Sequence, residues 1–171
     1  MNRNQQKALT LLELLTTLAV IAVLLSIAPP SYSHLVERSR EQSIRDELLS
    51  HLHFTRTQAI STRRAHILCG SADGETCTGD WQHGWLVLRP HDRYVLRKFV
   101  PDTRPDLCWR GFGGSQVTFR GNGMSSASNG RFSFCRKQQP AWQIVINRQG
   151  RFKVASADSN ANCCSTSHTG S

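Results

Sequence analysis

The hydrophobic pattern of the chain changes twice, and the first change marks the end of a long apolar segment. Residues 9–28 form a run of 20 residues whose only charged side chain is Glu13. As a helix of about 30 Å, such a run is long enough to cross the apolar core of a bilayer. The short basic stretch before it, residues 1–8, predicts a cytoplasmic N-terminus. Pro29 and Pro30 follow, and because each removes a backbone donor, we expect a kink or local melting there.

Apolar side chains at helical spacing continue beyond the prolines, over residues 29–64. The stripe comprises Ile44, Leu48, Leu52 and Ala59, and it is widened by Leu35, Leu49 and Ile60. Charged residues occupy the other face, so the pattern predicts one long N-terminal helix whose second half packs on a domain. His51 and His53 also lie in this segment, and we expect them on the solvated surface rather than at a metal site.

The second change comes at residue 65, where short runs typical of β-strands begin. About seven runs are separated by Gly, Pro and Asn, without a helical pattern between them: residues 65–70, 84–90, 93–100, 115–121, 130–137, 142–147 and 151–157. Their succession predicts tandem hairpins in an antiparallel β-sheet that leans on the helix, so the expected fold class is α+β. We expect the β-rich domain to cover residues 65–158 and a polar, cysteine-containing tail to cover residues 159–171.

Six cysteines lie in the β-rich part and the tail: Cys69, Cys77, Cys108, Cys135, Cys163 and Cys164. They form no C-x-x-C and have no zinc-site spacing, so no metal site is predicted. An even number of cysteines beyond a hydrophobic segment predicts disulfides in an oxidising compartment. Cys69 and Cys77 flank a turn-like insert, which favours a disulfide between them. Adjacent cysteines rarely bond to each other, so Cys163 and Cys164 are expected to reach two different partners. Cys135 lies on a late strand within reach of the tail and is expected to pair with Cys163 or Cys164, and Cys108 with whichever remains.

Basic residues concentrate in the last third of the chain. From Arg110 onward there are eight basic residues and one acidic residue, so this part carries +7 of the formal net charge of +9. A concentrated basic field is typical of a surface that meets a polyanion. The alternative is a basic surface that serves solubility alone.

One hairpin gathers some of this charge in a regular pattern. The segment "IVINRQGRFKVAS" is predicted to form a strand, a tight turn bracketed by an asparagine and a glycine, and a second strand. Alternation after the turn sends Phe152 and Val154 toward the core, and Arg151 and Lys153 toward solvent beside Arg148. The expected result is a compact basic edge, for which a solvated edge without a ligand is the alternative.

Motifs of catalysis are missing from the sequence. It contains no Gly-rich phosphate loop, no G-x-S-x-G and no H-E-x-x-H, and the seven histidines are scattered. We therefore expect neither an enzyme nor a bound cofactor.

Two simple interpretations of residues 9–28 leave observations unexplained. A cleaved secretory signal would fit the small residues Ser26 and Ala28, but Pro29 would then follow the scissile bond, where its ring hinders cleavage. A plain membrane anchor explains the length of the segment. It does not explain Glu13, since a carboxylate at membrane depth costs a few kcal/mol unless it is paired.

A third interpretation explains these features together. The segment resembles the type IV prepilin signal, which has a short basic leader, a small residue and then an apolar helix with Glu at its fifth position. Here the leader would end at Ala8 and the mature chain would begin at Leu9, so that Glu13 is the fifth residue of "LTLLE". Family members more often have Gly before the cut and Phe or Met after it. The resemblance implies cleavage by prepilin peptidase, N-methylation of Leu9, and pairing of Glu13 with the N-terminal amine of a neighbouring pilin in the filament.

The rest of the chain resembles the FimT/GspH family of minor pilins and pseudopilins. The relevant stretches are "RTQAISTRRA", "GWLVLRP" and "IVINRQGRFKV", and the resemblance covers nearly the whole chain. It implies the type IV pilin-like fold, with residues 9–28 in the inner membrane or filament core and the β-rich domain in the periplasm or at the exterior. Its partners would be other pilins.

The same resemblance also implies a ligand. In FimT-type proteins a Gly-Arg-x-Arg motif in this region is implicated in binding DNA for uptake, and here it stands as Gly150-Arg151-Phe152-Lys153. Lys in place of the second Arg keeps the charge but loses the bidentate fork. Double-stranded DNA is thus the expected ligand of Arg148, Arg151 and Lys153. Two other functions of the whole chain remain as alternatives to a DNA-binding minor pilin. One is a type II secretion pseudopilin of the H type, which acts in protein secretion, and the other is a membrane-anchored β domain without a filament.

Overall fold

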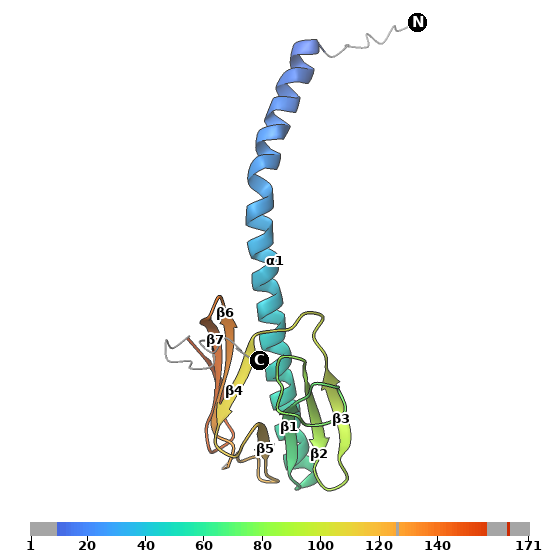
Figure 1. Ribbon diagram of the computed structural model, residues 1–171, viewed down its shortest axis with the longest axis vertical. Helices are drawn as coiled ribbons and strands as arrows, with labels where there is room; N and C mark the ends of the chain where they lie inside the picture. Colours follow the sequence, from blue (N-terminus) through green and yellow to red (C-terminus); the bar gives the residue numbers. More distant parts are fainter. Residues whose placement is uncertain (1–9, 126, 157–163, 165–171) are drawn as a thin grey trace, which may run out of the picture. The chain divides into compact units, whose positions relative to one another are not determined.

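A computed structural model describes residues 10–125, 127–156 and 164 of the 171-residue chain. The chain divides into two compact units, residues 1–43 and 44–171, and each is described by itself. One helix, α1 (Leu11–Thr62), contributes to both units (Figure 1). It runs without interruption through Pro29 and Pro30, so the predicted local melting is not found.

The residues at the two ends of α1 explain where the helix begins and where it ends. At the start, the Thr10 hydroxyl accepts a hydrogen bond from the Glu13 N–H at 3.3 Å. This is the geometry of an N-cap, and Glu13 stands at the position where an acidic residue completes a capping box. At the other end, Arg63 adopts a left-handed conformation (φ 53°), and its N–H donates to the Ile60 carbonyl at 3.2 Å. Such a residue closes the last turn of a helix.

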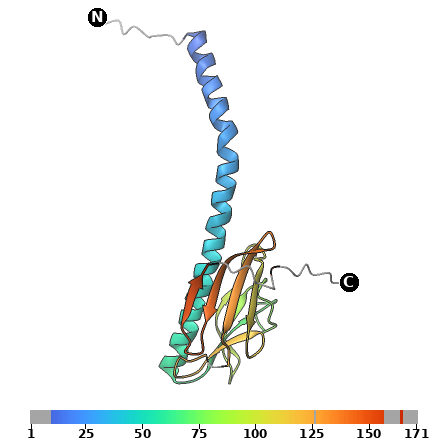
Figure 2. The ribbon, with the colours of Figure 1, turned by 90° about the vertical axis from the view of Figure 1, so that its left-hand side faces the viewer.

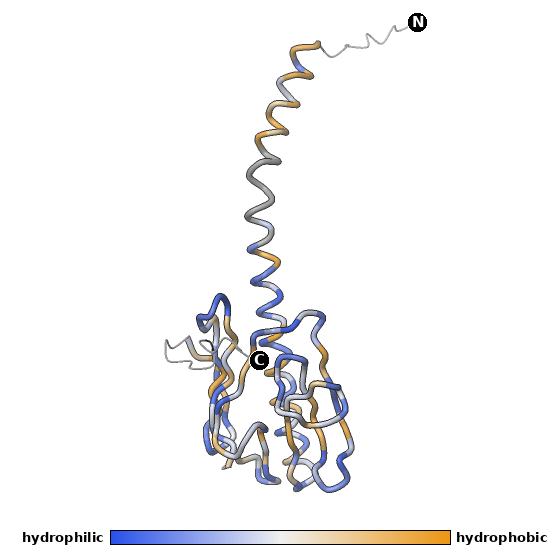
Figure 3. The backbone as a smooth tube through the Cα atoms, in the orientation of Figure 1, coloured by the Kyte–Doolittle hydropathy of each residue, from blue (hydrophilic) through white to orange (hydrophobic). Residues whose placement is uncertain are grey.

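Apolar side chains in the first unit remain uncovered by the chain. Figure 3 shows apolar residues over the first turns of α1. Large side chains there, such as Leu11, Leu14, Leu18 and Val20, are exposed by half or more of their surface. Within the described part of the chain, no helical stretch combines the length and the hydropathy that a membrane crossing requires. The predicted span of residues 9–28 includes positions outside the described residues and side chains, and it stays a prediction.

Two antiparallel four-stranded sheets make up the β-rich part of the second unit (Figures 1 and 2). The first has the order β3-β2-β1-β5 and the second the order β4-β6-β7-β8. The strands of the first sheet are β1 (His66–Gly70), β2 (Trp85–Arg89), β3 (Tyr94–Phe99) and β5 (Gln116–Phe119). Those of the second are β4 (Leu107–Gly111), β6 (Gly130–Arg136), β7 (Gln139–Ile146) and β8 (Phe152–Ala155).

The predicted α+β fold is confirmed, while the predicted arrangement of its strands is partly wrong. All seven expected strands exist, but β4 was missed because "LCWRG" is short and lacks clean alternation. Tandem hairpins join β2 to β3, β6 to β7 and β7 to β8. In contrast, β5 returns to pair with β1, and β4 pairs with β6, so the strands form two antiparallel sheets.

A single large core joins the second half of α1 to both sheets. The side chains of Leu48, Leu52 and Ala59 are fully buried, as the stripe predicts. They pack in the same cluster as Trp85 of the first sheet and Phe132 of the second. Burying a leucine stabilises such packing by about 1.5–3 kcal/mol.

Three positions of the predicted pattern differ in burial. Ile60 is 47% exposed, and Leu35, in the first unit, is 64% exposed. His51 is only 3% exposed, so its expected place on the surface is wrong. Its ring meets Trp85 edge-on at 6.1 Å, and its Nδ1 lies 3.0 Å from the Glu47 carbonyl oxygen. The cause is helical spacing, since position 51 lies one turn from the buried positions on either side.

Candidate nucleic-acid interface

The turn between β7 and β8 is held by its own backbone. The N–H of Gly150 donates to the Asn147 carbonyl at 3.0 Å, and the N–H of Asn147 donates to the Arg151 carbonyl at 3.0 Å. The Asn147 side chain adds a third bond, because its Oδ1 accepts from the Arg151 N–H at 2.9 Å. Gly150 has φ 73°, which an L side chain rarely adopts. The turn has the asparagine and glycine roles that the sequence predicts.

A second set of contacts fixes this turn on the loop that follows β5. The Ser125 N–H donates to the Arg148 carbonyl at 3.0 Å. Gly150 is buried against Gly123, whose carbonyl oxygen would overlap a Cβ at position 150. Any larger residue at Gly150 would therefore push the turn away from the loop.

Arg148, Arg151 and Lys153, here called the hairpin cations, are all exposed. Phe152 between them is half-buried, packs on the core and meets the His53 ring at 4.5 Å. Among the described residues, the ion pairs of this protein involve other side chains than these three. The hairpin cations thus face solvent as the sequence predicts. Because the backbone of the turn is already ordered, a phosphate contact by these cations costs side-chain entropy but no ordering of the loop.

Val154 departs from the prediction that it faces the core. It lies opposite Ile144 and so on the core side of the sheet, but it is 44% exposed. Because β8 is the last strand of its sheet, fewer neighbours cover its side chains.

Strand register aligns further cations that the sequence alone does not place. Arg110 of β4 is opposite Arg131 of β6, Arg131 is opposite Val145 of β7, and Val145 is opposite Lys153 of β8. Residues directly opposite each other share a face of the sheet. Arg110, Arg131 and Val145 also line a surface cavity of about 460 Å³ beside Phe112. The composition shows how many arginines there are, but only the pairing puts these in one row.

The disulfides hold the β-rich unit at two places. Cys69 and Cys77 are joined, with Cα atoms 5.5 Å apart, in agreement with the prediction from their spacing. Cys135 is joined to Cys164, with Cα atoms 5.4 Å apart, which decides between the two partners that the sequence left open. Cys108 is also disulfide-bonded. Cys163, its expected partner, lies outside the described residues.

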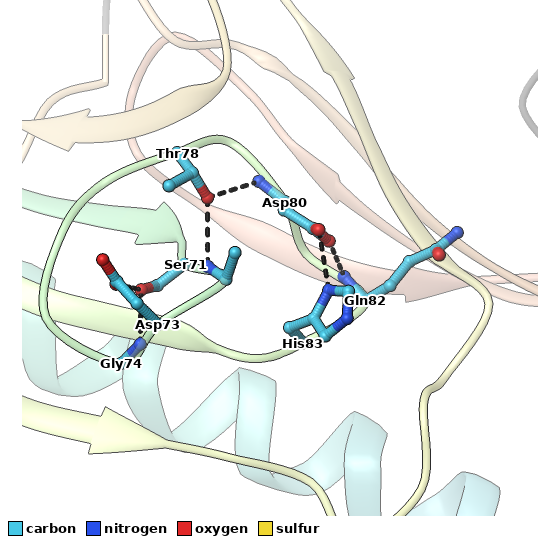
Figure 4. A network of polar contacts seen from close by, with 8 residues as sticks. Ser71, Asp73, Gly74, Thr78, Asp80, Gln82 and His83 are labelled. Atoms are coloured by element: carbon cyan, nitrogen blue, oxygen red, sulfur yellow. Dashed lines mark hydrogen bonds and ion pairs between the residues drawn. The ribbon is translucent and has the colours of Figure 1, made fainter. Parts of the chain in front are cut away.

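A polar network braces the loop between β1 and β2, which the first disulfide ties to β1 (Figure 4). Asp73 accepts bonds from the Thr76 hydroxyl at 2.6 Å, the Thr76 and Glu75 N–H groups at 2.8 Å each, and the Ser71 hydroxyl at 2.9 Å. These bonds, led by the Thr76 hydroxyl, hold the pKa of Asp73 well below its usual value. Their number and closure within one loop indicate a structural role.

Asp80 anchors the end of the same loop. Its carboxylate lies 2.7 Å from His83 Nδ1 and accepts from the Gln82 N–H at 2.9 Å. Burial raises the pKa of Asp80, but the bonds from Gln82 and His83 outweigh it, so the pKa is lowered. Within the described residues, no three or more His, Cys, Asp or Glu side chains gather as a metal site would require.

The residues expected to govern processing and assembly lie at the N-terminus. Ala8 and Leu9 fall outside the described residues. Glu13 is in the first turn of α1 and exposed. An anion is favoured at this end of a helix by the macrodipole. The capping geometry of Thr10 was missed, although the spacing Thr10-x-x-Glu13 is a recognisable signal for it.

Comparison with known proteins identifies related families and folds. The family model described as type II transport protein GspH matches residues 45–150, and the prokaryotic N-terminal methylation motif matches residues 3–29. No curated protein sequence matches the chain.

Two crystal structures of the Pseudomonas aeruginosa type IV minor pilin FimU are similar in fold. One has a TM-score of 0.56 at 24% identity and covers 72% of this chain and 96% of that chain. The other has a TM-score of 0.52 at 23% identity, with 68% and 96% covered.

Proposed function

This chain belongs to the GspH family, a family of pilin-like structural proteins rather than enzymes, and we propose that it is a minor type IV pilin that binds DNA. In this proposal prepilin peptidase cuts between Ala8 and Leu9, and Leu9 is methylated. Residues 9–28 then anchor the chain in the inner membrane and later enter the filament core, where Glu13 pairs with the N-terminal amine of a neighbouring pilin. The methylation motif over residues 3–29 supports this route.

Two features support a membrane-anchored protein whose β-rich unit lies outside the cytoplasm. The described part of the chain has no free cysteine, and disulfides persist in oxidising compartments. The apolar residues at the start of α1 are exposed and require a partner, either lipid or other helices. A single-pass protein with its β-rich unit in the periplasm satisfies both requirements.

The proposal of DNA binding is carried by one observation, the hairpin cations on a fixed turn. Arg148, Arg151 and Lys153 are exposed on a backbone that hydrogen bonds hold in place. Lysine and arginine that neutralise phosphates give sequence-independent, salt-sensitive binding. The expected ligand is duplex DNA, and the expected affinity at moderate salt is roughly micromolar or weaker.

Fluorescence anisotropy across a salt series tests this proposal on the full-length protein in a non-ionic detergent. Each phosphate contact adds about 0.9 to the slope of log affinity against log salt. Changing all three hairpin cations to Gln should therefore reduce that slope by about 3, and Arg151→Gln alone by about 1. A matched control is Arg104→Gln, an exposed arginine in the loop between β3 and β4. An unchanged slope in the triple variant would exclude the hairpin as the site.

A second candidate function is that of a type II secretion pseudopilin. It is favoured by the description of the matching family model, which is a type II transport protein. In that role the β-rich unit would contact other pseudopilins and exported protein, and the hairpin cations would be a solvated edge. Absence of duplex binding by the wild-type protein even at low salt would favour this candidate.

A further inference from the structure

Three segments that are distant in the sequence meet at one end of the β-rich unit, where α1 ends (Figures 1 and 2). Arg56 of α1 donates from Nε to the Gly123 carbonyl at 3.1 Å. The loop after β5 also presses on the residue that closes α1, because a Cβ at Gly121 would overlap the Arg63 backbone. The same loop holds the β7–β8 turn, because the Ser125 N–H donates to the Arg148 carbonyl. Helix end, loop and turn thus form one packed corner.

Each of these segments contributes exposed arginines. Arg63 and Arg64 follow α1, and Arg120 lies in the loop; these three are here called the corner arginines. Arg148 in the turn, already one of the hairpin cations, is the fourth. The backbone beneath them is fixed. The Arg120 N–H donates to the Met124 carbonyl at 2.9 Å, and its carbonyl accepts from the Gly123 N–H at 2.7 Å. The cations are therefore presented from an ordered frame rather than from a mobile loop.

The corner carries little opposing charge. Residues 48–72 and 107–157, which include all three segments, contain no Asp or Glu. Asp92, in the turn between β2 and β3, is engaged by Arg89 Nη2 at 2.9 Å. A one-sign field of this kind attracts a polyanion and raises its association rate.

The chemistry of the corner favours a duplex over a single strand. Residues 56–64, 120–125 and 147–151 contain no aromatic residue, and Phe152 beside them is half-buried against the His53 ring and the core. Proteins that bind single-stranded nucleic acid stack its bases on aromatic side chains, whereas contacts to a duplex backbone need only positioned cations. The corner offers the second kind of contact alone.

We propose that the corner arginines and the hairpin cations form one continuous surface for the phosphate backbone of duplex DNA. This inference rests on the proposed DNA-binding function and extends it from one hairpin to the end of α1. Six contacts give a salt slope of about −5, whereas the hairpin cations alone give about −3. Between 50 and 200 mM salt the affinity then falls on the order of 1000-fold, against on the order of 50-fold for the hairpin alone.

The experiment compares three double variants of the full-length protein in detergent, by anisotropy with one labelled duplex across a salt series. The corner variant is Arg64→Gln/Arg120→Gln, and the hairpin variant is Arg151→Gln/Lys153→Gln. The control, Lys98→Gln/Arg104→Gln, also removes two exposed charges. Both positions lie away from the corner. Lys98 is next to Phe99, which pairs with Trp85, and Arg104 lies just before Leu107, which pairs with Phe134. Both pairs are at the ends of their sheets that lie opposite the corner. Thermal melting checks that each variant is folded.

The expected result is that the corner and hairpin variants each make the salt slope less steep by about 2, from about −5 to about −3. The control should leave the slope unchanged. A corner variant that behaves like the control, beside a weakened hairpin variant, would overturn this inference and leave the proposed function standing. A weakened corner variant beside an unchanged hairpin variant supports the corner as a site and overturns the role of the hairpin. No duplex binding by the wild type, or tighter binding of a single strand of equal length, overturns the duplex surface.

Discussion

Glu13 combines a backbone N–H that caps α1 with a charged side chain, and substitution removes only the charge. Its N–H takes part in the N-cap with Thr10, and its carboxylate stands at the start of α1, where the macrodipole favours an anion. Gln is compatible with the capping position but carries no charge. Because the N–H that bonds to Thr10 belongs to the backbone, Gln and Ala both keep this bond, and both remove the charge expected to pair in a filament.

We expect both Glu13→Gln and Glu13→Ala to remain in the membrane fraction and to enter filaments about tenfold less than the wild type, or worse. An ion pair worth about 1.4 kcal/mol accounts for a factor of ten. Immunoblots of sheared filaments and of membranes measure both quantities. Glu37→Gln, on the same helix, is the control. Normal incorporation of Glu13→Gln would show that the charge is dispensable.

Asp73 gives a pH-dependent test of the loop between β1 and β2. Because its pKa in the folded state is lowered from 3.8, its hydrogen bonds stabilise the fold fully above that unfolded value and lose this effect as pH falls. Asp73→Ala should therefore lower the melting temperature at neutral pH, and the difference from the wild type should shrink below about pH 4. Asp102→Ala is the control for an exposed carboxylate. A difference that is constant down to pH 3 would contradict this account.

At the element scale, disulfides tie strands to distant or neighbouring segments. The Cys135–Cys164 bond closes a separation of 29 residues, and the Cys69–Cys77 bond a separation of 8. Loss of loop-closure entropy in the unfolded chain predicts stabilisation of about 3.6 and about 2.5 kcal/mol, respectively. The longer link should thus contribute more.

Paired Cys→Ser variants test this order. Cys135→Ser/Cys164→Ser should lower the free energy of unfolding by about 3–4 kcal/mol, and Cys69→Ser/Cys77→Ser by about 2–3 kcal/mol. Urea unfolding without reductant gives both values, and peptide mapping without reduction verifies the remaining bonds. A larger loss in the variant with the shorter loop would show that local packing, rather than loop entropy, dominates.

At the scale of the whole molecule, the proposed pilin route begins with removal of residues 1–8. Mass spectrometry of protein extracted from membranes should find a chain that starts at Leu9 and carries an N-methyl group. The substitution Ala8→Leu should abolish the cut, because the position before it requires a small residue. A chain that starts at Pro29 instead would indicate a secretory signal and contradict the pilin route.

Local pattern was sufficient wherever the deciding contacts lie close in sequence. The stripe of Leu48, Leu52 and Ala59 predicted the buried face of α1, since helix neighbours are three or four residues apart. Asn147 and Gly150 predicted the β7–β8 turn, whose hydrogen bonds span four residues at most. Seven strands were predicted from their residue types, and β4 was missed because its sequence lacks that signal.

Burial at single positions was less predictable. His51 is polar by type but lies between buried positions of α1, and Val154 is apolar but lies on an edge strand. In both cases the neighbours that cover or expose the side chain come from elsewhere in the fold. Residue type alone gives only a tendency toward burial.

Sequence alone was enough to predict the fold class, the helix, the cysteine pair 69–77 and the basic hairpin, because each depends on composition or on neighbours along the chain. The division of the strands into two sheets, the partner of Cys135 and the corner of Arg63, Arg120 and Arg148 became apparent only in three dimensions. These features follow from non-local strand pairing and loop docking. Such contacts contribute free energy only once segments distant in the sequence have packed together, so no local pattern in the sequence reports them.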